Sequence, residues 1–248
     1  MCSAIWSRIV SFKRTLILIV LVTALMSITS CSGLDDRRTL WRGKKALARR
    51  EKDVEELVEI RGRLRRIVEM KIRAVHLLES TNRVLGRKYL EIGSYNLALE
   101  ALKEAEYLDP GSAFVKKDIG ECYYLLGQAA MTGEERDEYF TFSRKYYEAS
   151  IAIQPQLAES HYGLGVLLFF AYGDVYGAID QMKIILEYEP ENLEAHFALG
   201  RFYYEVDELG KALGEYITLN RILPRGSPKK KQVEENIIRI NRELGINE

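Results

Sequence analysis

One spaced set of residues occurs four times in the sequence, and this repetition constrains the fold more than any other feature does. Each copy begins with an aliphatic residue and a glycine, continues through bulky and small residues at helical intervals, and ends in proline. The copies are Leu85-Gly86, Tyr89, Ala98, Leu102, Ala105 and Pro110; Ile119-Gly120, Tyr123, Ser143, Tyr147, Ser150 and Pro155; Leu164-Gly165, Leu168, Ala178, Met182, Ile185 and Pro190; and Leu199-Gly200, Tyr203, Ala212, Tyr216, Leu219 and Pro224. The third copy has one extra residue before Ala178, and the second has about eleven before Ser143. Such repetition predicts a stack of helical hairpins.

Each position in the set has a physical reason. The glycines are small where the first helix of a hairpin contacts the second, and the small residues Ala98, Ser143, Ala178 and Ala212 are their counterparts. We expect the bulky residues, Tyr89, Tyr123 and Tyr203 with Leu102, Tyr147, Met182 and Tyr216, to fill the spaces between hairpins. Each proline should end a second helix, because its ring and its missing N–H cannot be continued in a helix.

This pattern resembles the tetratricopeptide repeat (TPR), a helix-turn-helix of about 34 residues. The resemblance implies an all-α, right-handed solenoid of about four hairpins over residues 79–226, with repeats at about 79–112, 113–157, 158–192 and 193–226. Ser143 and Ser150 stand where the family usually has alanine, and the tryptophan often found early in the first helix is absent.

Two segments next to the repeats are predicted to be helical or solvated. The charged insertion at residues 131–141 favours an extension of two helices or a solvated loop over a buried element. Ser227-Pro228 is a helix start, and residues 227–248 then form a capping helix that covers the last apolar face of the solenoid. We expect its Lys229-Lys230-Lys231 run to be a solvated face.

The amino terminus has the pattern of a targeting segment. Residues 1–14 contain three basic residues and no acid, and an apolar run follows from Leu16 to Met26. The run ends in Ile28-Thr29-Ser30-Cys31, which resembles a bacterial lipobox. This resemblance implies a signal peptide at residues 1–30 and acyl (palmitate-type) attachment at Cys31. Many lipoproteins that are retained in the inner membrane have an aspartate after the lipidated cysteine, and this chain has Ser32 there. The resemblance therefore favours the outer membrane, with the chain facing the periplasm.

An uncleaved membrane helix is the alternative, because no charged residue occurs from Thr15 to Leu34. Residues 35–54 contain eight Lys/Arg, against three before the apolar run, and the positive-inside rule would then keep the following chain in the cytoplasm. Against this topology, the second half of the run is rich in Ser and Thr and contains Gly33, which is poor material for a membrane span.

The zero net charge of the whole chain hides an asymmetry. Residues 37–73 contain 14 Lys/Arg and 6 Asp/Glu, whereas residues 74–248 contain 19 and 28. Apolar residues recur at three- and four-residue steps from Val54 to Leu78, so residues 31–78 are predicted to form a basic stem with one long helix or a helical hairpin. Its charge would suit anionic headgroups or a solvated helix face, and its few aromatic residues argue against nucleic-acid binding.

The sequence contains no motif for catalysis, a cofactor or a metal. Gly163-Leu164-Gly165 lacks the third glycine and the preceding strand of a dinucleotide-binding loop. His161 and His196 occupy the same position of consecutive repeats, where packing is expected rather than metal binding. Cys122 is expected to be an inert core thiol. We therefore expect no enzyme and no cofactor.

The predicted function is a membrane-anchored scaffold that binds a protein or peptide, while the oligomeric state is left open. The resemblance implies that the first helix of each hairpin lines the concave, binding face. The residues placed there are Arg83, Arg87, Leu90, Phe114, Lys117, Glu121, Tyr124, Tyr162, Val166, Phe169, Phe170, Phe197, Arg201, Tyr204 and Glu205. A partner with apolar side chains, and an acidic end near Arg83 and Arg87, is expected. Alternatives are a small-ligand or transport-accessory module and a cytoplasm-facing anchored adaptor.

Overall fold

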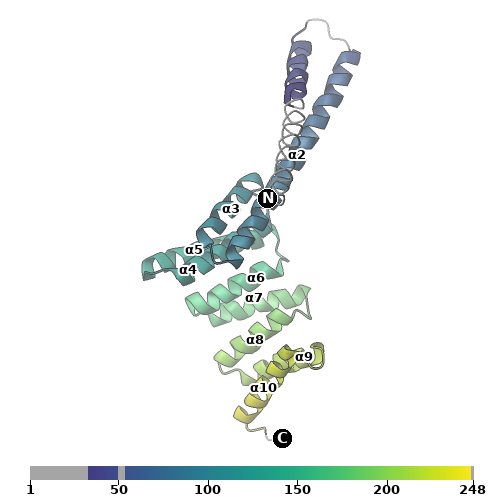
Figure 1. The fold of residues 1–248 in the computed structure, drawn as a ribbon. Helices are drawn as coiled ribbons and strands as arrows, with labels where there is room; N and C mark the ends of the chain where they lie inside the picture. The colour runs from purple at the N-terminus through teal and green to yellow at the C-terminus, as the bar shows by residue number, and fades with distance from the viewer. Residues whose placement is uncertain (1–32, 50–53, 247–248) are drawn as a thin grey trace, which may run out of the picture. The chain divides into compact units, whose positions relative to one another are not determined.

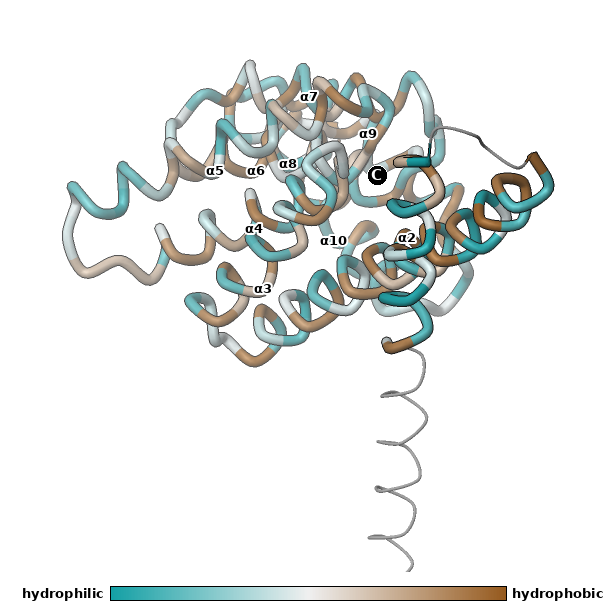
Figure 2. The backbone as a smooth tube through the Cα atoms, turned by 90° about the horizontal axis from the view of Figure 1, so that it is seen from above, coloured by the Kyte–Doolittle hydropathy of each residue, from teal (hydrophilic) through white to brown (hydrophobic). Residues whose placement is uncertain are grey.

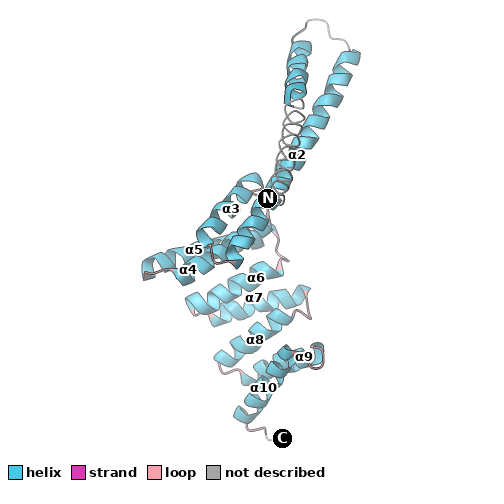
Figure 3. Cartoon of the chain, viewed as in Figure 1, coloured by secondary structure: helices cyan, strands magenta, loops and turns pink. Residues whose placement is uncertain are grey.

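The computed structural model describes residues 33–49 and 54–246, and every regular element in these ranges is a helix (Figure 3). In chain order they are a helix at residues 33–48, α2 (Val54–Glu91), α3 (Tyr95–Leu108), α4 (Ala113–Ala129), α5 (Gly133–Ile153), α6 (Ala158–Leu167), the π-helix η1 (Leu168–Tyr172), α7 (Val175–Tyr188), α8 (Leu193–Glu205), α9 (Leu209–Ile222) and α10 (Pro228–Glu243). Cys31 and the expected signal peptide, residues 1–30, lie outside the described residues. The chain divides into two units, with the boundary inside α2 between Val75 and His76.

The described part of the first unit is a helical hairpin, one of the two forms expected for the basic stem (Figure 1). A Cβ on Gly43 would lie 3.4 Å from Cγ2 of Ile60 and 3.6 Å from Cδ1 of Leu64, so the two helices are in close contact there. Near the connection, Arg49 Nη1 pairs with Glu56 Oε2 at 2.6 Å. An apolar seam with basic residues around it therefore holds this hairpin together.

The second unit is a stack of helical hairpins in which α2 contacts α3 through Gly86 and Leu102, and each helix from α3 onward contacts the next along the chain (Figure 1). The part of α2 after His76 and α3 form the first hairpin, followed by α4 with α5, α6 and η1 with α7, and α8 with α9. Residue 78, the expected end of the stem, lies inside α2. Apolar and polar stretches alternate along each helix (Figure 2), as in helices that pack by one apolar face. The all-α solenoid expected from the repeats is confirmed.

Local sequence sets the helix ends. The side chains of Ser112, Thr132, Asp174, Asn192 and Ser227 each accept a hydrogen bond from a backbone N–H in the first turn of the helix that follows. The helices before the four repeat prolines end two residues ahead of each proline, as expected from the clash that proline imposes on its predecessor.

The glycine of each repeat leaves room for a bulky side chain of the second helix in the same hairpin. A Cβ on Gly86 would lie 2.6 Å from Leu102, and one on Gly200 would lie 2.8 Å from Tyr216. Tyr147 and Met182 lie against Gly120 and Gly165 in the same way. The expectation that these bulky residues fill only the spaces between hairpins is therefore incomplete, because each of them also packs on the glycine of its own hairpin.

The two serines that replace the usual alanines make buried hydrogen bonds between helices. Ser143 Oγ donates to the carbonyl of Gly120 at 2.8 Å, and Ser150 Oγ lies 2.7 Å from the carbonyl of Ala113. Ser150 Oγ also lies 2.7 Å from Ser160 Oγ of the next hairpin. Both serines are fully buried, so these bonds join helices without leaving a polar group unpaired.

The irregular spacings of the second and third copies have different structural origins. The insertion lengthens both helices of the second hairpin, since α4 has 17 residues and α5 has 21, against 13 and 14 in α8 and α9. This confirms the helical extension. The single extra residue of the third copy lies in η1, because Leu168 is five residues before Gly173, the left-handed turn residue, whereas Tyr203 is four residues before Asp207. A π-turn absorbs one residue in this way.

The capping helix is confirmed, with one correction. Pro228 occupies the first turn of α10, Ser227 caps it, and Val233 and Ile240 are fully buried against the last hairpin. Lys230, expected on a solvated face, instead donates from Nζ to the carbonyl oxygens of Asn220 at 2.6 Å and Leu223 at 3.2 Å. These are orphan carbonyls at the end of α9, and a cation is favourable there.

Candidate functional site

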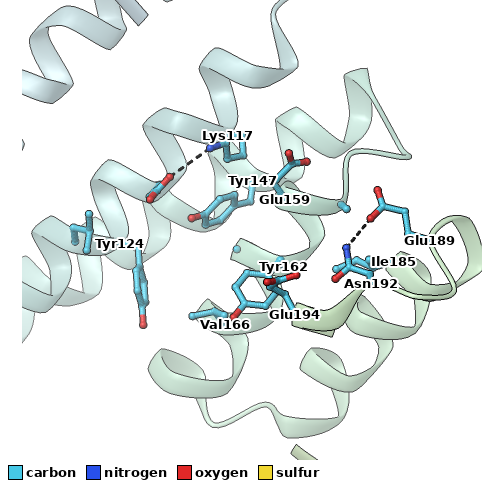
Figure 4. A pocket seen from close by; sticks show the side chains of 14 residues that line it. Lys117, Tyr124, Tyr147, Glu159, Tyr162, Val166, Ile185, Glu189, Asn192 and Glu194 are labelled. Carbon is cyan, nitrogen blue, oxygen red and sulfur yellow. Dashed lines mark hydrogen bonds and ion pairs between the residues drawn. The ribbon is translucent and has the colours of Figure 1, made fainter. Parts of the chain in front are cut away.

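A pocket of about 560 Å³ opens on the face formed by the first helices of the middle hairpins (Figure 4). Its residues come from α4, α5, α6, the end of α7 and the start of α8. They are Lys117, Glu121, Tyr124, Leu125, Tyr147, Ala158, Glu159, Tyr162, Gly163, Val166, Ile185, Glu189, Asn192 and Glu194. Its volume lies within the range of about 300–1,000 Å³ that is typical of ligand pockets. We call it the first-helix pocket.

Five of the residues predicted for the binding face line this pocket: Lys117, Glu121, Tyr124, Tyr162 and Val166. They share a face of α4 or α6 because they are spaced by three or four residues. Tyr162 is 38% exposed, and burial raises its pKa, with nearby Glu194 adding to the rise. Tyr124 accepts a hydrogen bond from Gln128 Nε2 at 2.9 Å, and burial raises its pKa as well. Both rings therefore offer neutral, partly exposed surfaces.

The pocket lining contains four carboxylates, Glu121, Glu159, Glu189 and Glu194, and a single cation, Lys117. Lys117 is nearly buried, and its Nζ lies 2.5 Å from Asp118 Oδ1 and 3.4 Å from Glu121 Oε2. Its charge is thus already compensated from within α4. The lining is therefore acidic overall.

Asp118, a fully buried carboxylate behind the pocket, joins the first two hairpins. Its Oδ2 accepts a hydrogen bond from Arg83 Nε of α2 at 2.9 Å, while Oδ1 contacts Lys117 in poor hydrogen-bond geometry. The guanidinium of Arg83 also lies over the ring of Phe114 at 5.0 Å. Arg83 and Phe114, both predicted for the binding face, are therefore engaged with other residues of the chain.

The remaining predicted residues lie outside the pocket. Leu90 packs on the core of the first two hairpins, and Arg87 and Glu205 are exposed. Phe169 stacks on the buried Phe202 at 4.4 Å, and Arg201 lies over Phe170 at 4.8 Å. Near the cap, Tyr204 donates to Glu243 of α10 at 2.8 Å, and Lys229 lies 6.0 Å from the ring of Phe197.

Several residues of the pocket were not predicted from the sequence. Glu159 precedes Tyr162 by three residues and Glu194 precedes Phe197 by three, so the helical period could have placed both on this face. Tyr147 could not have been found in this way, since it lies on a second helix. Its ring is 3% exposed, yet it lines the pocket, and in Figure 4 its hydroxyl faces the space between Tyr124 and Tyr162.

The hydroxyl of Tyr147 has no hydrogen-bond partner among the described residues. Burial holds its pKa well above the usual value, and the neighbouring carboxylates of Glu121 and Asp118 add to this rise. The group therefore stays protonated and keeps both an O–H donor and acceptor lone pairs. A polar group of this kind, on a buried ring at the wall of a pocket, is available to a ligand.

The two repeat histidines are packing residues in the structure. His196 Nδ1 lies 2.6 Å from Glu215 Oε2, and His196 Nε2 lies 2.9 Å from the carbonyl of Pro190. His161 makes the matching pair of contacts with Gln181 and Pro155. Within the described ranges, no three His, Cys, Asp or Glu side chains are grouped so as to hold a metal ion. The same ranges contain no helix long and apolar enough to cross a bilayer.

The fold and the pocket define a helical-repeat solenoid of the TPR type. It is similar to a thermophilic TPR protein from Thermus thermophilus, with 21% identity over 64% of this chain and 81% of that one and a TM-score of 0.58. MamA from Desulfovibrio magneticus is 15% identical, and the match covers 68% of this chain and 86% of MamA with a TM-score of 0.54. The TPR protein YrrB is 16% identical, and the match covers 67% of this chain and 78% of YrrB with a TM-score of 0.50.

Sequence comparison adds little to these structural similarities. No known family model matches the chain. The CTR9 homolog of Arabidopsis thaliana is 26% identical over an alignment of 146 residues, and the match covers 52% of this chain and 13% of that protein. The chain therefore spans a small part of that relative's length.

Proposed function

We propose that this chain is a scaffold that binds a peptide segment of another protein in the first-helix pocket. The observation that carries the proposal is the unpartnered hydroxyl of the buried Tyr147 in a pocket with the partly exposed rings of Tyr124 and Tyr162. Tyrosine rings at the centre of a hollow are frequent anchors of protein interfaces. YrrB, one of the similar structures, is described as a TPR protein with an unusual peptide-binding site, which supports the same use of this fold.

The test is capture of the partner with a matched pair of variants. Tyr162→Ala removes a pocket ring, while Tyr107→Ala removes a ring that is 81% exposed on α3 and outside the pocket. A partner lost only with Tyr162→Ala, with unchanged melting curves for both variants, is the expected result. Equal retention in both variants would contradict the pocket as the binding site.

The second part of the proposal is a lipid anchor at Cys31, which would hold the scaffold at the bacterial envelope, facing the periplasm, with the outer membrane favoured. Its support is the lipobox sequence together with the apolar run before it. Several acyl chains at about 0.8 kcal/mol per buried methylene anchor a protein durably. Wild type should be labelled by a fatty-acid analogue, and Cys31→Ala should be unlabelled and retain residues 1–30. An unlabelled wild-type chain that keeps residues 1–30 would instead favour the uncleaved anchor.

A further inference from the structure

The polar groups that face the first-helix pocket without a partner of their own are acceptors or can act as acceptors. Glu159, in the first turn of α6, has no partner among the described residues, and Glu194 has only a long 3.5 Å contact with Lys229. The hydroxyl of Tyr147 can accept through its lone pairs. This set contains two carboxylates and no cationic donor.

The nitrogen donors among the side chains that line the pocket are already engaged, which leaves the tyrosine hydroxyls as its free donors. Asn192 donates from Nδ2 to Glu189 Oε2 at 2.6 Å, and its Oδ1 accepts from the backbone N–H of Ala195 at 2.9 Å. Lys117 is held by Asp118 and Glu121. A ligand with carboxylates would therefore meet the negative charge of Glu159 and Glu194 with no free cation in the pocket lining, which costs free energy on desolvation.

Resting on the proposed function, we propose that the pocket takes a Lys or Arg side chain of the bound peptide. Its aliphatic stem would lie on the rings of Tyr162 and Tyr124, and its cationic head would donate to Glu159, Glu194 and the Tyr147 hydroxyl. A cation next to tyrosine rings gains from their negative faces, and charge-assisted hydrogen bonds are about twice as strong as neutral ones. This replaces the apolar partner with an acidic end expected from the sequence, because Arg83 is already paired with Asp118.

Gly163 and Tyr147 make the site specific to this hairpin. A Cβ on Gly163 would lie 2.7 Å from the Tyr147 hydroxyl oxygen, so only glycine leaves room for the ring to cross from α5 to the pocket. In the fourth hairpin Tyr216 occupies the same repeat position and is buried, but it does not line the pocket. Tyr216→Phe is therefore a matched control for Tyr147→Phe.

The experiment selects peptides from a phage-displayed random library on the full chain in detergent. Enriched peptides should contain Lys or Arg well above the unselected library. A selected peptide should bind about tenfold or more weakly to the Glu159→Gln, Glu194→Gln double variant and measurably more weakly to Tyr147→Phe. The exposed Glu100→Gln on α3 and Tyr216→Phe should bind it as wild type does. All four proteins should melt like wild type, since the altered groups have exposed or unpartnered polar atoms.

Two other results would be decisive in different ways. Enrichment of apolar or acidic peptides, or an unchanged affinity in the double carboxylate variant, would overturn the cationic side chain and leave the peptide scaffold standing. Absence of any enrichment, together with retention of the cellular partner by Tyr162→Ala, would contradict peptide binding in the first-helix pocket as well.

Discussion

The ring of Tyr147 lies between Gly120 of its own hairpin and Gly163 of the next, in contact with both. A Cβ on Gly120 would be 3.0 Å from the ring, and one on Gly163 would be 2.7 Å from its hydroxyl. One side chain thus fixes the spacing of α4 and α6 and carries the free polar group of the pocket. The packing of the solenoid and the chemistry of the site therefore depend on the same residue.

The glycine contacts predict a difference between two substitutions in the fourth hairpin. Gly200→Ala would drive a methyl against the Tyr216 ring, and overpacking of this kind costs about 1–3 kcal/mol. Gly214→Ala, in α9 with open space around it, should instead stabilise the protein by about 0.5–1 kcal/mol through helix propensity. Urea unfolding followed by circular dichroism measures both. Equal effects of the two would show that the Gly200 contact is not tight.

The buried carboxylate of Asp118 should contribute far more stability than an exposed one. Asp118→Ala leaves Arg83 without its counter-ion and Lys117 with a single partner, and removal of one side of a buried pair costs about 3 kcal/mol. Asp180 pairs with Lys183 at 3.4 Å on an exposed face, so Asp180→Ala should change the free energy of unfolding by no more than about 0.5 kcal/mol. A small loss for Asp118→Ala would contradict the buried ion pair.

Asp207 has a positive φ of 58°, where Gly93 and Gly173 stand in the corresponding turns of the first and third hairpins. A side chain in this left-handed conformation is strained, so Asp207→Gly should raise the free energy of unfolding by about 0.5–1 kcal/mol. Asp207→Ala should lower it, since alanine tolerates this conformation less well than aspartate does. Thermal melts of the two variants should therefore shift in opposite directions, and a shift in the same direction would argue against the turn geometry.

Cys122 is fully buried, and burial raises the pKa of its thiol from 9.0 to about 12. Alkylation requires the thiolate, so Cys122 should resist iodoacetamide at pH 8 in the folded protein and react after unfolding in urea. The unfolded state loses this proton first, so the thiol's contribution to stability is complete below pH 9 and decreases as the pH rises toward about 12. Rapid alkylation of Cys122 in the native protein at pH 8, located by mass spectrometry of its peptides, would show an open core.

The repeat pattern made most of the second unit predictable, because the positions of Gly86, Gly120, Gly165 and Gly200 report contacts between neighbouring helices. The extra residue of the third copy was visible in the spacing, but its placement in η1 depends on backbone hydrogen bonding that spacing does not specify. For the site, the helical period places Tyr162 and Glu121 on one face. The helical period cannot show that the Tyr147 side chain, which belongs to α5, also lines the pocket. It also cannot show that Arg83 forms an ion pair with Asp118.

The most direct measurement is photo-crosslinking in intact cells, with a benzoylphenylalanine residue placed at position 162 or, as control, at position 107. Tyr162 lines the first-helix pocket, whereas Tyr107 is exposed on α3 away from it. A partner crosslinked from position 162 and not from 107, through a segment that contains Lys or Arg, is the result we predict. Crosslinking from position 107 with none from 162 would contradict binding in the pocket.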